Sequence, residues 1–65
     1  MRYAEPKTEK QEMDLVQALV GRKVRTADGQ MVKITGLDRD EDYGTTIVLL
    51  ENQTWMHLPE VQEVI

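Results

Sequence analysis

The 65-residue chain has no cysteine, no serine and no phenylalanine, and its only histidine is His57. Without cysteine it can form neither a disulfide framework nor a thiolate zinc site, so neither can reinforce a small core. The lack of cysteine also fits a reducing compartment, and we expect a cytoplasmic protein. Without serine or cysteine, and with no activating base evident beside its threonines, we expect no catalytic residue and no enzyme.

Long apolar runs are absent as well. The longest is Ile47-Val48-Leu49-Leu50, whereas a membrane-spanning helix needs about 20 predominantly apolar residues. The first residues contain no apolar stretch of the kind found in a signal peptide. We therefore expect no membrane association.

The net charge of −4 is spread unevenly along the chain. Residues 21–35 carry four basic groups against one acid, whereas residues 36–65 carry one basic group against seven acids. An acidic chain argues against a dedicated nucleic-acid binder, which usually presents a basic footprint. The local asymmetry still provides charged faces for a partner.

The first third of the chain predicts a polar arm followed by a helix. Residues 1–7 are expected to form a flexible arm, with a single small domain over residues 8–65. Thr8 is a suitable N-cap for a helix over residues 9–20, with Gln11 placed to reach back to the Thr8 amide. Gly21 can end that helix in a left-handed conformation.

The predicted helix has a wide apolar face, which includes Leu15. A stripe of this kind most often packs into a core. Alternatively, it offers a surface for a homodimer, because so short a chain gains much from extra burial. The residues of this second interpretation are Met13, Val16, Leu19 and Val20.

The remainder of the chain predicts five short strands. Their turns are rich in Gly, Asn and Asp, and Pro59 ends the fourth strand because it lacks an amide donor. A short 3₁₀ turn over residues 58–61 should precede the last strand. The predicted strands cover residues 22–26, 30–37, 45–51, 54–58 and 62–65.

The first hairpin has a predictable register. A three-residue loop with Gly29 at positive φ pairs Val24 with Val32, so that apolar side chains share one face. Gly36 lies where a barrel strand must bend. Residues 38–44 are expected to form a polar loop between the second and third strands.

The third strand is apolar on both faces. Ile47 and Leu49 should point one way, and Val48 and Leu50 the other way. Both faces should therefore be covered. One would form the barrel core, and the other would pack against the N-terminal helix or a partner.

Residues 22–65 resemble the SH3-like small barrels in three respects. These are the five-strand order, the bend at Gly36, and the run of residues 55–65, which looks like a fourth strand, a 3₁₀ turn and a fifth strand. The resemblance implies a mainly β fold, a five-stranded barrel with one N-terminal helix. It also implies a docking module of the kind found in bacterial and phage accessory proteins.

The candidate protein-contact residues lie on the fourth strand and in the acidic loop. Trp55 and His57 alternate on the strand and should share a face. We expect Trp55 to be a packing anchor in the core, and it becomes the first candidate hot spot if it is exposed. The other candidates are Tyr43, Asp38, Asp40, Glu41 and Asp42.

Two alternative functions come from other residues. Lys23, Arg25 and Lys33 should share the outer face of the first hairpin, where they could contact phosphates. Asp38, Asp40 and Asp42 have the spacing that begins a calcium loop. That pattern then stops, because Tyr43 stands at its sixth position and Leu49 at its twelfth. We therefore assign no metal ligand and no cofactor, and weak binding of a divalent cation by residues 38–42 stays a second alternative function. The function that we expect is non-enzymatic docking on a protein partner.

Overall fold

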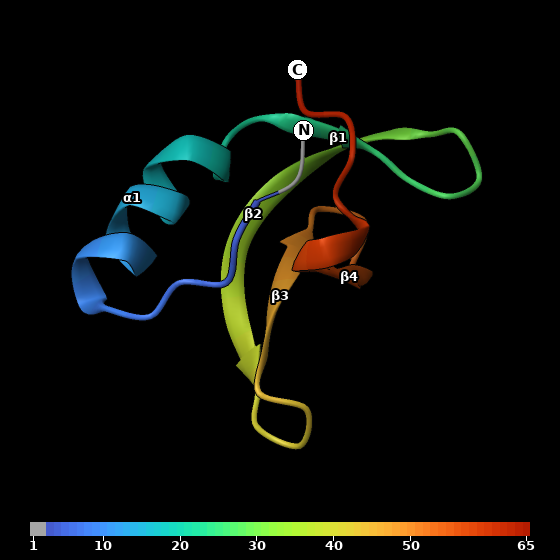
Figure 1. The fold of residues 1–65 in the computed structure, drawn as a ribbon. Helices are drawn as coiled ribbons and strands as arrows, with labels where there is room; N and C mark the ends of the chain where they lie inside the picture. Colours follow the sequence, from blue (N-terminus) through green and yellow to red (C-terminus); the bar gives the residue numbers. More distant parts are fainter. Residues whose placement is uncertain (1–2) are drawn as a thin grey trace.

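The computed structural model describes residues 3–65, so Met1 and Arg2 of the predicted arm lie outside the described residues. A helix, α1 (Glu9–Leu19), precedes four strands that pair antiparallel in chain order into one curled sheet, a half-barrel (Figure 1). The prediction of a mainly β fold with one N-terminal helix is confirmed. No helix in the described range is long and apolar enough to cross a membrane. The remaining elements are β1 (Lys23–Arg25), β2 (Met31–Asp40), β3 (Thr45–Leu50), β4 (Trp55–His57) and the 3₁₀ turn η1 (Leu58–Glu60).

The predicted fifth strand is wrong: residues 3–65 contain four strands. The C-terminal segment reaches β1 only through an isolated bridge between Val24 and Val64. Two backbone hydrogen bonds flank it, from Arg25 N to Glu63 O at 3.2 Å and from Ile65 N to Lys23 O at 2.9 Å. Because β1 is only three residues long, it offers the returning chain too little edge for a longer ladder.

The predicted polar loop of residues 38–44 is also wrong in extent. Asp38 and Asp40 belong to β2, where they pair with Ile47 and Thr45 of β3. The turn is confined to residues 41–44 and is closed by a 2.7 Å hydrogen bond from Gly44 N to Asp40 O. The backbone hydrogen bonds to β3 keep Asp38 and Asp40 in the strand despite the low β-propensity of aspartate, and their side chains point to the solvent-accessible side of the sheet.

The predicted register of the first hairpin is confirmed. Val24 pairs with Val32, and Gly29 adopts a φ of +85° in the three-residue loop. The bend predicted at Gly36 corresponds to a β-bulge, where the β2–β3 register shifts between Ile34 and Gly36. This bulge makes the sheet curl between its two hairpins.

The helix ends follow the sequence prediction with two small differences. The Thr8 side chain accepts a 3.1 Å hydrogen bond from Gln11 N, as an N-cap should. The Gln11 side chain accepts from the amide of Lys7 at 2.7 Å, not from that of Thr8. The helix ends at Leu19, one residue earlier than predicted, and Gly21 adopts the expected left-handed conformation, with a φ of +90°.

The core lies between the helix, the concave face of the sheet and η1. The helix contributes Leu15 and Leu19, whereas Met13, Val16 and Val20 are exposed. Of the four residues proposed for a dimer surface, only Leu19 therefore packs into the core, together with Leu15, and it is not available to a dimer partner. The other buried apolar residues are Val24, Val32, Ile34, Val48, Leu50, Leu58 and Val61.

Residues 3–7, predicted as a flexible arm, lie against this core. Tyr3 packs on the core cluster. The Glu5 carboxylate accepts hydrogen bonds from Thr46 N at 3.1 and 3.2 Å and from Thr46 Oγ1 at 2.7 Å. Thr46 lies beyond the paired part of β4, so Glu5 takes the place of a strand partner.

Candidate interaction surface

One face of the sheet, called here the outer face, carries the candidate residues on three adjacent strands. Thr46, Val48 and Leu50 are buried, so Thr45, Ile47 and Leu49 point to the opposite side of β3. Pairing then places further side chains on that same side. These are His57 and Trp55 from β4 and Asp38 and Asp40 from β2.

Trp55 stands on this outer face and is 54% exposed. Its ring meets the His57 ring edge to face, with centroids 5.1 Å apart and planes at 88°. The prediction that Trp55 is a core anchor is therefore wrong. The reason is the register: Trp55 pairs with the outward-pointing Leu49, while Met56 takes the inward position beside Val48.

The helix does not cover the outer face. Leu15 and Leu19 of α1 join the same buried cluster as Val48 and Leu50. Ile47 and Leu49 remain only half-buried. The helix, which was one of the two expected covers for the second face of β3, therefore packs on the inner face instead. Among the described residues, Trp55 and His57 are the β4 side chains that stand beside Leu49 and Ile47 on the outer face.

His57 is half-buried and held on both sides. Its Nδ1 lies 3.3 Å from Thr45 Oγ1. Its backbone N donates to Glu60 Oε2 at 3.2 Å, which links β4 to η1. The contacts of the ring with Thr45 and Trp55 set the orientation of the imidazole, and the bond to Glu60 holds its backbone.

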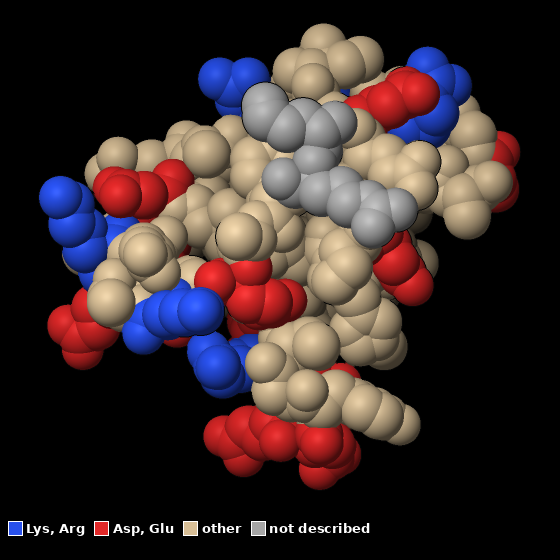
Figure 2. All heavy atoms as spheres, viewed as in Figure 1, with Lys and Arg blue, Asp and Glu red and all other residues tan. Residues whose placement is uncertain are grey.

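The acidic residues gather at the tip of the β2–β3 hairpin, where they form the red cluster at the bottom of Figure 2. Asp38 Oδ1 accepts from Arg39 N at 2.7 Å, and Asp40 Oδ1 accepts from Asp42 N at 3.0 Å. Tyr43 stands in the same turn and is 79% exposed. Within residues 3–65, no group of three or more acidic, histidine or cysteine side chains converges as a metal site requires.

The basic candidates share a face, as predicted, at the other hairpin. Lys23 pairs with Lys33, and Arg25 pairs with Met31. Arg25 Nε also lies 2.7 Å from Glu63 Oε2, so part of its charge is compensated within the chain. This pairing weakens the basic footprint expected of a phosphate-binding face.

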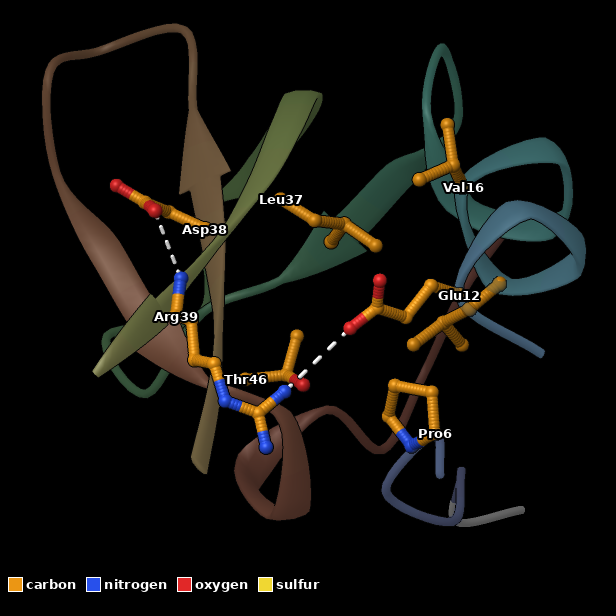
Figure 3. Close-up of a pocket in the computed structure, with 8 residues that line it drawn as sticks. Pro6, Glu12, Val16, Leu37, Asp38, Arg39 and Thr46 are labelled. Carbon is orange, nitrogen blue, oxygen red and sulfur yellow. Dashed lines mark hydrogen bonds and ion pairs between the residues drawn. The ribbon is translucent and has the colours of Figure 1, made fainter. Parts of the chain in front are cut away.

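A pocket of about 250 Å³ between α1, the arm and β2 was not predicted from the sequence. Figure 3 shows Arg39 reaching from β2 toward Glu12 on the helix, with Nη1 and Oε1 3.4 Å apart. Leu37 and Pro6 also line this space. The residues come from three distant segments, and no local spacing in the sequence signals that they meet.

In comparisons with protein-family models, with curated proteins and with solved structures, nothing matches this chain.

Proposed function

We propose that this chain is a non-enzymatic protein-interaction module that docks through the outer face of β3 and β4. One observation carries the proposal. Trp55 is 54% exposed and shares the outer face with half-buried Ile47 and Leu49. An exposed tryptophan on an apolar floor is the kind of side chain that dominates binding energy at protein interfaces.

The surroundings of Trp55 suit a contact of this kind. The contacts of His57 with Trp55 and with Thr45 already restrict these side chains, so that they lose little conformational freedom on binding. Asp38 and Asp40 add negative charge to the same face. Charges at the rim mainly steer association and select partners, whereas the buried aromatic anchor supplies affinity.

We also propose that the half-barrel is an SH3-like one. The C-terminal residues return to β1 after a 3₁₀ turn, and a bulge at Gly36 bends the long second strand. These features support the assignment, although the last strand is reduced to the bridge at Val64. The assignment bears on architecture alone, because one fold serves many functions.

Affinity capture from a lysate of the organism that encodes the chain tests the docking proposal. Trp55→Ala should lose bound proteins that the wild type retains, and Asp40→Lys/Asp42→Lys should slow their capture. Met13→Ala is the matched control, because Met13 is similarly exposed, at 63%, but stands on α1. Quantitative mass spectrometry of the captured proteins provides the measurement.

Two results would contradict this proposal. Equal recovery of all partners by the wild type and Trp55→Ala would remove the outer face from the interaction. Loss of partners with Met13→Ala alone would move the interaction to the helix. Circular dichroism of each variant ensures that lost binding does not reflect lost folding.

A further inference from the structure

The strand β4 has a free edge. It ends the sheet on one side, and β1 ends it on the other. The edge of β1 is partly occupied, because Val64 forms a bridge with Val24 there. Within residues 3–65, no strand or bridge lies along the outer edge of β4. A free edge of this kind is a template for pairing with another chain.

The open backbone groups of this edge belong to Trp55. Hydrogen-bonded and non-hydrogen-bonded pairs alternate along an antiparallel ladder. Leu50 N donates to Thr54 O at 3.0 Å, so Trp55, the next residue, directs its N–H and C=O away from β3. The N–H of His57 points the same way and donates to Glu60. In the described part of the chain, no backbone hydrogen bond outside the strand ladders involves Trp55.

A groove runs along this edge, between β4 and the tip of the first hairpin. It consists of two adjoining hollows of about 330 and 560 Å³. They form one groove, because Thr26, Ala27, Met56 and Glu60 line both. The apolar residues along it are Ala27, Leu50, Trp55, Met56 and Pro59.

The groove carries negative charge. Its charged residues are Arg25, Asp28, Glu60 and Glu63. Arg25 and Glu63 compensate each other, since Nε and Oε2 lie 2.7 Å apart. Asp28 from the hairpin loop and Glu60 from η1 form no ion pair with any described residue. The charge that is left uncompensated in the groove is therefore acidic.

The edge of β1 shows how a short strand takes an extended segment. Arg25 N donates to Glu63 O at 3.2 Å, and Ile65 N donates to Lys23 O at 2.9 Å. The side chains of this contact have opposite charges, because Arg25 pairs with Glu63. Three residues of edge therefore suffice for a bridge to a segment of complementary charge. β4 also has three residues, and the charge beside it is acidic.

We propose that the groove beside β4 binds an extended, lysine- or arginine-rich segment of a partner protein. This goes beyond docking through the outer face, because it concerns the edge of β4 and names the chemistry of its ligand. The backbone of the segment pairs with the N–H and C=O of Trp55, as in strand addition. Its long side chains lay their aliphatic stems over Met56 and Ala27 and place their charged ends near Asp28 and Glu60.

A basic peptide fits the groove better than other ligands. An acidic segment meets Asp28 and Glu60 with the same sign. A polyamine matches the charge but leaves the backbone groups of Trp55 without a partner. No three acidic, histidine or cysteine side chains among the described residues converge as a compact metal ion requires. The basic peptide alone matches the edge, the apolar lining and the charge together.

NMR titration of the full chain with a capped peptide in which lysine alternates with threonine tests the inference. The methyl signals of Met56 and Ala27 and the amide signal of Trp55 should shift saturably, with an affinity that falls as salt rises. The Met13 methyl signal is the internal control, because Met13 is exposed on α1, outside the groove. A peptide with glutamate in place of lysine should cause no shift.

A matched pair of variants tests the role of charge. Asp28→Asn/Glu60→Gln removes the negative charge and keeps oxygen acceptors for the Thr26 hydroxyl and the His57 amide. It should weaken peptide binding by about three- to tenfold, as expected for two exposed ion pairs. Glu9→Gln/Asp14→Asn removes the same charge from exposed positions of α1 and should leave binding unchanged. Circular dichroism establishes that each variant is folded.

Three results would overturn the inference: no saturable shift of the Met56 and Ala27 methyls, equal affinity for the lysine peptide and for spermidine or the glutamate peptide, or unchanged binding by Asp28→Asn/Glu60→Gln. Docking through the outer face has a separate outcome. If the peptide does not bind but Trp55→Ala still loses captured partners, the groove fails and the outer face stands. If the peptide binds as expected but Trp55→Ala keeps every partner, the outer face fails and the groove stands.

Discussion

The two faces of β3 differ although the strand is apolar on both. Val48 and Leu50 lie in the core with α1 and η1 packed over them. Ile47 and Leu49, their immediate neighbours, stay half-buried on the outer face. Apolar composition alone therefore does not tell which side of a strand is covered, because cover comes from segments distant in the sequence.

The inner and outer faces of the sheet also differ in the segments that pack on them. The inner side receives a helix, a 3₁₀ turn and the carboxylate of Glu5. On the outer side, Trp55 and His57 of the adjacent strand β4 stand beside Leu49 and Ile47. The inner face therefore maintains the fold, whereas the outer face stays partly open to solvent.

The largest effect should come from a matched pair of leucines. Leu50→Ala removes a buried side chain and should lower the free energy of unfolding by about 2–4 kcal/mol. Leu49→Ala, one residue away on the outer face, should cost about 1 kcal/mol or less, because water already reaches that side chain. Urea titration at low protein concentration measures both. Equal losses would mean that the outer face is covered in solution.

The next effect concerns the arm on the inner face. Glu5→Ala leaves the amide and hydroxyl of Thr46 without their hydrogen-bond partner in a buried position. We expect a loss of about 1–3 kcal/mol of unfolding free energy. Glu41→Ala removes an exposed carboxylate from the β2–β3 turn and should change stability by less than about 0.5 kcal/mol. Thermal denaturation of both variants gives the comparison, and equal stability would place Glu5 outside the fold.

Alanine substitutions at two glycines distinguish the cost of backbone strain from the cost of an added side chain. Gly29 has a φ of +85°, so Gly29→Ala should cost about 1 kcal/mol from strain alone. Gly36→Ala places a methyl group on the outer face at ordinary contact distance from Leu49, and it should be close to neutral. If Gly36→Ala destabilises the monomer more than Gly29→Ala, the outer face is more tightly packed than the structure indicates. Chemical denaturation of the two variants decides this.

The smallest effect lies at the tip of the first hairpin. A hydrogen bond from the Thr26 hydroxyl lowers the pKa of the Asp28 carboxyl below its usual value. Thr26→Val should raise that pKa, as followed by NMR titration. Because the folded-state pKa is depressed, the associated stability is present above the unfolded pKa and is lost as pH falls through the folded one. Thr54→Val, at a turn whose hydroxyl contacts Asn52, should leave the Asp28 titration unchanged.

Local chemistry made several features predictable from the sequence. The glycine at positive φ and the need for apolar side chains to share a face determined the first hairpin. Thr8 and Gly21 marked the limits of the helix. Alternation placed Trp55 and His57 together, which is the basis of the candidate surface.

Other features depended on where distant segments meet. The exposure of Trp55 follows from its partner on β3, since a shift of one residue would have turned it inward. The helix packs through Leu15 and Leu19, and not through its whole apolar stripe, because of how α1 meets the sheet. Contacts such as Glu5 with Thr46 join residues 41 positions apart.

By itself, the sequence determined the helix caps, the first hairpin and the presence of four strands, because propensity, alternation and turn geometry act over a few neighbouring residues. Only the tertiary structure decided which face of β3 became core and which face kept Trp55 at its surface. Burial depends on which segments pack over a side chain, and in a chain this small one helix can cover only one side of the sheet.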